Sequence, residues 1–246
     1  MTTEPIAFIA PDWPAPTRVR AMITTRAGGV SGGPYAALNL GDHVGDEPAA
    51  VAQNRAGLAA YLPAAPLWLR QVHGTAVADA LRDRPGCEAD ASFTHTPGRV
   101  LAVLTADCLP VLLAEETGAT VAIAHAGWRG LATGVIERTV AALGTEPANL
   151  LAYLGPAIGP HAFEVGNDVR DAFVRTDAQA AAAFQPTPSG KWLADLYALA
   201  RLRLAKIGTS HVYGGDFCTF GDASRFYSYR RDGVTGRMAS LIWLEP

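Results

Sequence analysis

Val100-Leu-Ala-Val-Leu-Thr-Ala-Asp-Cys-Leu-Pro-Val-Leu-Leu-Ala-Glu-Glu-Thr-Gly-Ala-Thr-Val-Ala-Ile-Ala-His-Ala126 is the stretch that best indicates the fold. It holds three short apolar runs, Val100–Thr105, Leu109–Ala114 and Thr120–Ala124. The runs are rich in valine, leucine or isoleucine, and turn residues separate them, so they are too short and too interrupted for helices. Continuous apolar runs of this length predict strands that are covered on both faces.

The rest of the chain alternates between strand and helix patterns. Further strands are expected at Val19–Thr25, Leu150–Leu154, His211–Tyr213, Phe226–Arg230 and Arg237–Leu244. Helices are expected from an N-cap at Asp46 to about Tyr61, over Gly127–Leu143, from Asn167 to about Phe184, and over Trp192–Lys206. Because these elements interleave without strict βαβ periodicity, we expect an α+β (mixed α/β) class with a mixed sheet, in a single domain over residues 1–246.

Composition narrows the function classes. Of the 246 residues, 49% are hydrophobic and 17% charged, and a net charge of −3 argues against non-specific binding to nucleic acid. Three widely spaced cysteines fit a reducing compartment better than a disulfide framework. The N-terminus lacks the basic region of a signal peptide, and no apolar run approaches the roughly 18 residues of a membrane span. We therefore expect a cytoplasmic protein without membrane or nucleic-acid partners.

Three side chains have the chemistry of metal ligands and follow apolar or extended segments. Cys108 comes after the first run, His125 follows the third, and His73 lies in the segment Gln71–Gly74. Two imidazoles and one thiolate match a zinc site whose fourth position is open to water or substrate. No spacing rule joins His73 to the other two. A buried cysteine that acts only as a small hydrophobic residue, and structural histidines, are the alternatives.

Polar residues near these candidates could bind substrate. The carboxylate of Asp107 could orient a ligand or a water molecule. Arg129 and the free N–H groups at the start of the helix expected from Gly127 suit an anion such as phosphate. Asn39 and His43, in the polar and glycine-flanked segment 39–46, are candidates for contacts to substrate or phosphate.

Several motifs, spread over nearly the whole chain, resemble the laccase-domain family, once called multicopper polyphenol oxidases and now regarded as purine nucleoside phosphorylases. They are Thr24–Ser31, Leu38–Gly41, Gln71–Thr75, Thr105–Leu113, His125–Gly130, Leu154–Pro160, Phe163–Gly166 and Ser228–Gly233. The resemblance implies that His73, Cys108 and His125 bind zinc (Zn²⁺). It also implies layered sheets with flanking helices, and phosphate-dependent cleavage of adenosine, inosine, guanosine and methylthioadenosine, with adenosine deamination as a second activity.

Three hypotheses follow for function. In the first, a zinc enzyme acts on a nucleoside and phosphate, and either Asp107 or Glu164 shuttles the proton that deamination needs. In the second, the same three ligands hold copper (Cu²⁺) in a phenol oxidase. Six histidines without a His-x-His pair argue against the trinuclear centre of a multicopper enzyme. In the third, a zinc-stabilised module with a closed fourth ligand binds a protein partner. The oligomeric state is not predicted.

Overall fold

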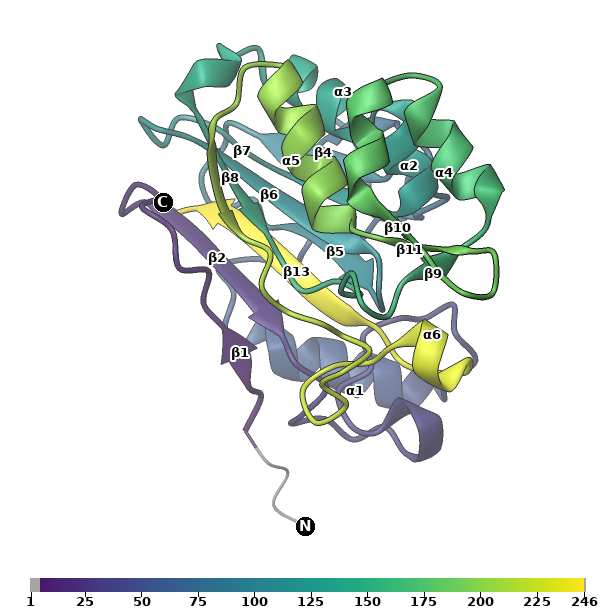
Figure 1. Cartoon of the computed structure of the whole chain (residues 1–246). Helices are drawn as coiled ribbons and strands as arrows, with labels where there is room; N and C mark the ends of the chain where they lie inside the picture. Colours follow the sequence, from purple (N-terminus) through teal and green to yellow (C-terminus); the bar gives the residue numbers. More distant parts are fainter. Residues whose placement is uncertain (1–4, 246) are drawn as a thin grey trace.

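The computed structural model describes residues 5–245, and its strands and helices are interspersed along the chain without strict alternation (Figure 1). Residues 1–4, within the N-terminal segment expected not to be a signal peptide, lie outside the described residues. The strands are β1 (Phe8–Ile9), β2 (Val19–Thr24), β3 (Val77–Asp79), β4 (Ala91–Thr94), β5 (Leu101–Thr105), β6 (Leu109–Glu115), β7 (Val121–Ala126), β8 (Leu150–Leu154), β9 (Glu164–Val165), β10 (Phe184–Pro186), β11 (Trp192–Ala194), β12 (His211–Gly214) and β13 (Met238–Leu244). The α-helices are α1 (Pro48–Ala59), α2 (Trp128–Thr133), α3 (Val135–Leu143), α4 (Asn167–Val174), α5 (Leu196–Lys206) and α6 (Tyr229–Asp232).

Most of the strands form two main sheets. The larger is six-stranded in the order β12-β8-β6-β7-β4-β3, and the other is four-stranded in the order β1-β2-β13-β5. In the larger sheet, β3 runs parallel to β4 and β12 parallel to β8, while the remaining pairs are antiparallel. A small third sheet joins β10, β11 and β9. The mixed sheet expected from the sequence is therefore confirmed.

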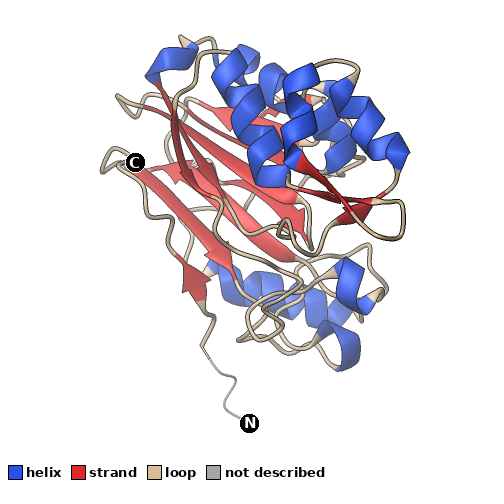
Figure 2. Ribbon diagram, viewed as in Figure 1, coloured by secondary structure: helices blue, strands red, loops and turns tan. Residues whose placement is uncertain are grey.

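The elements stack in four layers, with the two main sheets between helices (Figure 2). Helices α2 to α5 pack on one face of the six-stranded sheet and enclose the largest apolar core. The second core lies where the two sheets meet face to face. Helix α1 covers the outer face of the four-stranded sheet over the third core. Every residue of β5 and β7 is buried, and so is β6 except for its last residue, as the continuous apolar runs predicted.

Three of the expected helices differ from the structure. The helix expected over Gly127–Leu143 is two helices, because Gly134 takes a left-handed conformation (φ +97°) and ends α2. The helix expected from Asn167 ends at Val174 and is followed by a 3₁₀-helix, Ala178–Ala183. Trp192–Ala194 is a strand, and α5 starts only after Asp195, whose carboxylate accepts the N–H of Ala198 at 2.9 Å.

Two further predictions were wrong. The residue that precedes α1 as N-cap is Glu47, since the carboxylate of Asp46 is taken up by the side chains of Ser31 and Asn39. Of the expected strand Phe226–Arg230, the first three residues form a buried loop that ends at Ser228, the N-cap of α6, and Tyr229 and Arg230 are exposed residues of α6 itself. The apolar side chains of Phe226 and Tyr227 pack in a buried cluster, and neither residue pairs in a sheet. Among the described residues, no helix has the length and apolar character needed to cross a membrane.

Candidate metal centre

Sheet pairing brings candidate ligands to one end of the six-stranded sheet. Strands β6 and β7 are antiparallel, with Leu109 opposite Ala126. Cys108, directly before β6, and His125, near the end of β7, therefore lie at the same end. Strand β4 also runs antiparallel to β7 and starts at this end, which brings Asp90 beside them. The chain enters β3, parallel to β4, from the same side and so delivers the loop that carries His73.

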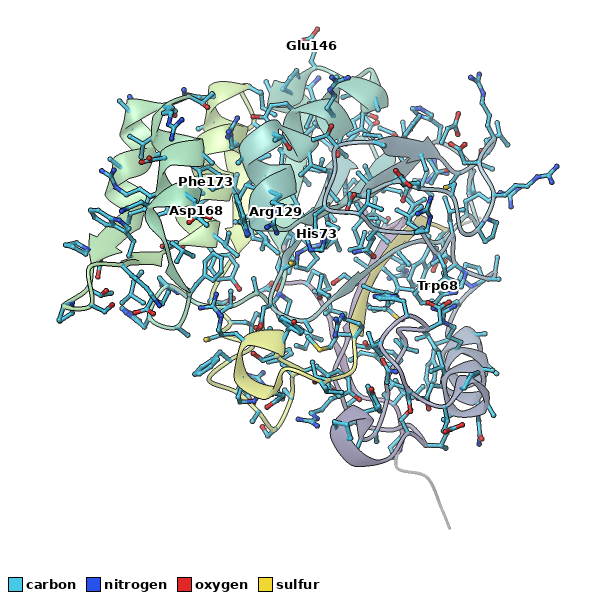
Figure 3. All side chains as sticks on the ribbon, turned by 90° about the vertical axis from the view of Figure 1, so that its right-hand side faces the viewer. Trp68, His73, Arg129, Glu146, Asp168 and Phe173 are labelled. Atoms are coloured by element: carbon cyan, nitrogen blue, oxygen red, sulfur yellow. The ribbon has the colours of Figure 1, made fainter. Side chains whose placement is uncertain are left out.

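The donor atoms of His73, Cys108 and His125 lie within 4.8 Å of one another. The Sγ atom of Cys108 is 3.8 Å from Nε2 of His73, and the two imidazole rings meet edge to face. His125 is buried, Cys108 is partly exposed and His73 is exposed, so solvent reaches the cluster from the His73 side. Figure 3 shows His73 below α2, with Arg129 above it on that helix. The three residues selected from the sequence are thus brought together.

A fully buried carboxylate, Asp90, holds both histidines in place. Its Oδ1 accepts the backbone N–H of His73 at 2.9 Å and lies 2.8 Å from Nδ1 of His125. Its Oδ2 accepts the N–H groups of Val72 at 3.1 Å and Gly74 at 2.6 Å. With Nδ1 of His125 donating to Asp90, Nε2 is left as the metal-binding nitrogen. A carboxylate that orients an imidazole in this way is typical of metal sites.

The sequence analysis missed Asp90. The available signal is weak: a carboxylate between two alanines, directly before a short strand. Its partner His125 lies 35 residues further along the chain, and only the pairing of β4 with β7 brings them together. No local sequence pattern indicates that two residues so far apart in the chain are in contact.

One residue of the cluster and one beside it adopt left-handed backbone conformations that favour glycine. His73 has φ +61° and Asp107 has φ +87°. The carboxylate of Asp90 stabilises the unfavourable conformation of His73 by accepting the N–H groups of three successive residues, Val72 to Gly74. Such conformations persist where surrounding contacts impose them, often at functional sites. Here they turn His73 and Cys108 toward the same point.

The carboxylate of Asp107 is occupied by the C-terminal loops. Its Oδ1 accepts the hydroxyl of Thr219 at 2.6 Å, and its Oδ2 accepts the hydroxyl of Ser228 at 3.0 Å and the N–H of Arg230 at 2.7 Å. The other expected shuttle, Glu164, is bound by Lys191 at 2.9 Å. Neither carboxylate belongs to the donor cluster.

Electrostatics favour a thiolate and an imidazolium in the absence of metal. Burial raises the pKa of the Cys108 thiol, but His125 and His73 outweigh it and bring that pKa down to about 6. Burial lowers the pKa of His125, yet the Cys108 thiolate and Asp90 raise it to about 9. For Asp90, burial is opposed by His125 and by backbone N–H donors, and the net pKa is lowered. The cysteine is therefore already deprotonated for metal binding near neutral pH.

These pKa values predict how metal affinity depends on pH. A metal must displace the proton that His125 carries below a pH of about 9, and below about 6 it must also displace the Cys108 proton. We expect zinc affinity to rise about tenfold per pH unit between those values, to fall more steeply below, and to level off above. Competition with a coloured chelator at several pH values measures this. An affinity that does not change from pH 6 to 8 would contradict the assignment.

The residues present fit a metal ion. Tetrahedral zinc separates a thiolate sulfur from an imidazole nitrogen by roughly 3.6 Å, near the observed 3.8 Å. The space between the ligands is kept free by Gly127, where a Cβ atom would lie 2.8 Å from Cδ2 of His73 and 3.1 Å from Sγ of Cys108. Among residues 5–245, no fourth protein donor joins the cluster, so one position is left for water or substrate.

Two cavities meet at the cluster. The first, about 380 Å³ and termed the polar cavity because it is the more polar of the two, has His43 and Arg237 among its walls, together with all three candidate ligands. The second, about 130 Å³, has largely apolar walls, including Trp128 and Phe163. Ala106, Cys108 and Tyr229 line both. A ligand with a flat apolar part and an anionic part could therefore occupy both cavities beside the metal.

The other sequence candidates lie at different distances from this centre. His43 lines the polar cavity. Asn39 is buried behind it, and its amide is used by Gly41, Asp46 and Arg237. Arg129, the second residue of the six-residue helix α2, is exposed and stacks on the ring of Trp128 at 4.5 Å. The structure thus brings His43 to the cavity but not Asn39 or Arg129.

Comparison with known proteins supports an enzymatic site. The model of the family described as multi-copper polyphenol oxidoreductase laccase matches residues 20–245. A Pseudomonas aeruginosa protein named purine nucleoside phosphorylase is 55% identical over 240 residues, covering 97% of this chain and 99% of that protein. Purine nucleoside phosphorylase YfiH of Escherichia coli is 54% identical, covering 96% of this chain and 98% of that protein.

Solved structures show the same fold. A Neisseria meningitidis protein superposes with a TM-score of 0.94 at 54% identity, covering 97% of this chain and 99% of that one. YlmD of Geobacillus stearothermophilus superposes with a TM-score of 0.92 at 32% identity, covering 100% of this chain and 98% of that one. The layered α+β architecture is therefore shared along the length of these chains.

Proposed function

This chain belongs to the multi-copper polyphenol oxidoreductase laccase family, and from that premise we propose that it is a zinc-dependent purine nucleoside phosphorylase. Its proposed substrates are adenosine, inosine, guanosine and methylthioadenosine, each cleaved with phosphate, and adenosine deamination is proposed as a second activity. Relatives named purine nucleoside phosphorylase, which this chain covers over nearly their whole length, support the assignment. The single domain over residues 1–246 and the cytoplasmic location stay predictions.

One observation carries the proposal: the donor cluster lies where an apolar, aromatic-walled cavity meets a polar cavity that contains an arginine. A purine has a flat face that packs well against Trp128 and Phe163. Phosphate needs a cation and hydrogen-bond donors, which the polar cavity offers. The two substrates of phosphorolysis could thus sit on either side of Cys108.

Phosphorolysis breaks the bond between ribose C1′ and the purine nitrogen and forms a bond from C1′ to a phosphate oxygen. Positive charge develops on the ribose and negative charge on the leaving base, so catalysis requires groups placed for those charges. Held by His73, Cys108 and His125, a zinc ion would supply Lewis acidity at an oxygen of substrate or water. The chain itself orients the site: Asp90 fixes His125 and the His73 loop. Tyr229 lines both cavities and helps to enclose the substrate.

Deamination requires addition of water at the purine carbon that carries the amino group, with loss of ammonia. A proton must then pass from that water to the leaving nitrogen. Asp107 and Glu164 stay the candidates for this transfer. Asp107 is the nearer of the two to the ligand space because it lines the apolar cavity.

Copper-dependent phenol oxidation is the second candidate, and the description of the family favours it. Two imidazoles and a thiolate also bind copper, which outranks zinc at most nitrogen and sulfur sites. Within residues 5–245, however, His73, Cys108 and His125 form the one cluster of three or more potential donors. A multicopper oxidase has a mononuclear and a trinuclear copper centre, and these would need more metal-binding side chains than this one cluster provides. The open fourth position and the two cavities likewise disfavour a purely structural zinc module.

The test uses one preparation stripped of metal and reloaded separately with zinc or copper. Each form is incubated with adenosine, with and without phosphate, and with a phenol, and the products are separated by chromatography. We expect the zinc form to release adenine and ribose 1-phosphate only when phosphate is present, and to form inosine by deamination. Phenol oxidation should grow with added copper. Phenol turnover by the copper form without adenosine cleavage by the zinc form would reverse the ranking.

A further inference from the structure

We propose that Arg237, Thr235 and His43 form an anion subsite beside the metal centre and that this subsite holds inorganic phosphate. The inference rests on the proposed function and adds to it the residues that bind the second substrate. The three residues line two adjoining cavities: Arg237 and His43 belong both to the cavity at the donor cluster and to the neighbouring cavity that contains Thr235.

The topology explains why Arg237 reaches the metal centre. Strand β13 begins at Met238, which pairs with Thr105 at the end of β5. The chain then crosses from β5 to β6 through Cys108. The residue directly before β13 therefore lies at the end of the molecule where the ligands meet, although it is far from them in sequence.

The position of Arg237 is held by several contacts. Its backbone N–H donates to Oδ1 of Asn39 at 2.9 Å, and Nη1 donates to the carbonyl oxygens of Thr235 and Gly236, each at 3.0 Å. Its aliphatic stem packs on Gly41, where a Cβ atom would lie 2.8 Å from Cγ of Arg237. Asn39 is thus a positioning residue that acts through Arg237, which accounts for its place in the motif without direct contact to substrate.

The guanidinium of Arg237 has no carboxylate partner among residues 5–245. Nearby acids are engaged elsewhere: Asp107 with hydroxyls and an N–H, and Asp232 with Arg231 at 2.8 Å. Asp42 pairs with Arg55 at 3.1 Å, and its other carboxylate oxygen lies 3.4 Å from Nδ1 of His43. Burial lowers the pKa of Arg237, which reflects the cost of holding this charge away from water. An anionic ligand would offset that cost.

The hydroxyl of Thr235 points to the same ligand. Thr235 is only 2% exposed, and its Oγ1 has no hydrogen-bond partner among the described residues. Buried hydroxyls are nearly always paired, so this one lacks a partner that a bound group could supply. Thr235 lines the adjoining cavity, and the free Nε and Nη2 donors of Arg237 and the His43 imidazole border both cavities, so a tetrahedral oxyanion bound there would meet several donors.

The test measures binding of inorganic phosphate to the zinc-loaded protein by calorimetry, so its readout does not depend on turnover. We expect Arg237→Gln to weaken phosphate binding about tenfold or more, and Thr235→Val, which keeps the shape but removes the hydroxyl, to weaken it about threefold. The matched control is Arg175→Gln, because Arg175 is exposed and pairs only with Asp171. We expect less than a twofold effect there. Zinc content and melting temperature check that each variant is folded.

Arg129→Gln tests the alternative that Arg129, rather than Arg237, binds phosphate. If Arg129→Gln weakens phosphate binding more than Arg237→Gln does, or if both Arg237→Gln and Thr235→Val bind phosphate like the parent protein, the inference is wrong. In either case phosphate-dependent cleavage of adenosine by the parent protein would leave the proposed function intact. Conversely, phosphate binding that depends on Arg237 in a protein that cleaves no nucleoside would support the subsite and reject the proposed function.

Discussion

Cys108→Ala is expected to remove most of the bound zinc and nearly all nucleoside cleavage. The thiolate is one of three donors, and structural zinc sites with four ligands are worth roughly 10–16 kcal/mol, or about 3 kcal/mol for each ligand. Losing one should weaken zinc binding about a hundredfold or more. The substitution also leaves His125 without the thiolate that raises its pKa. Zinc content by elemental analysis and adenosine cleavage at saturating phosphate measure the two effects.

Cys87→Ala is the matched control, because Cys87 is also a free, partly buried cysteine but packs against the apolar core between the sheets. It should keep its zinc and its activity. Full retention of both zinc and activity by Cys108→Ala would reject the metal-site assignment. Loss of zinc with retained phosphorolysis would separate the metal from the reaction and overturn the proposed zinc dependence.

Asp90→Asn is expected to have the second large effect, on both the metal site and the fold. Each oxygen of the carboxylate accepts two N–H donors. Asparagine keeps one oxygen and replaces the other with an NH₂ group that cannot accept. Whichever way the amide points, two N–H donors lose their hydrogen bonds to a charged acceptor, which should cost about 2–5 kcal/mol in the free energy of unfolding. With His125 and the His73 loop released, zinc affinity should fall about 10–100-fold.

Chemical denaturation and chelator competition measure these two quantities separately. Asp171→Asn is the matched control, because Asp171 is an exposed carboxylate that pairs with Arg175. It should change the free energy of unfolding by less than about 0.5 kcal/mol. An Asp90→Asn protein with the stability and zinc affinity of its parent would show that the buried carboxylate does not organise the centre.

The predictions that succeeded depend on local chemistry. The buried strands β5, β6 and β7 follow from uninterrupted apolar runs, since only a strand covered on both faces keeps such short runs from water. His73, Cys108 and His125 were found because few side chains bind zinc and each of these three follows an apolar or extended segment. Prediction failed where the same apolar pattern fits either a strand or a buried loop. Phe226 and Tyr227 are as apolar as the residues of a strand, but they pack in a loop.

The sequence by itself determined the buried strands, the mixed α+β class and the identity of the three metal-ligand candidates, because apolar patterning and donor chemistry are properties of single residues and short segments. Only the tertiary structure decided which other residues reach the centre. Asp90 arrives through the pairing of β4 with β7, and Arg237 through the pairing of β13 with β5. Both positions depend on strand register between distant segments, and register is set by packing of the whole sheet rather than by any local pattern.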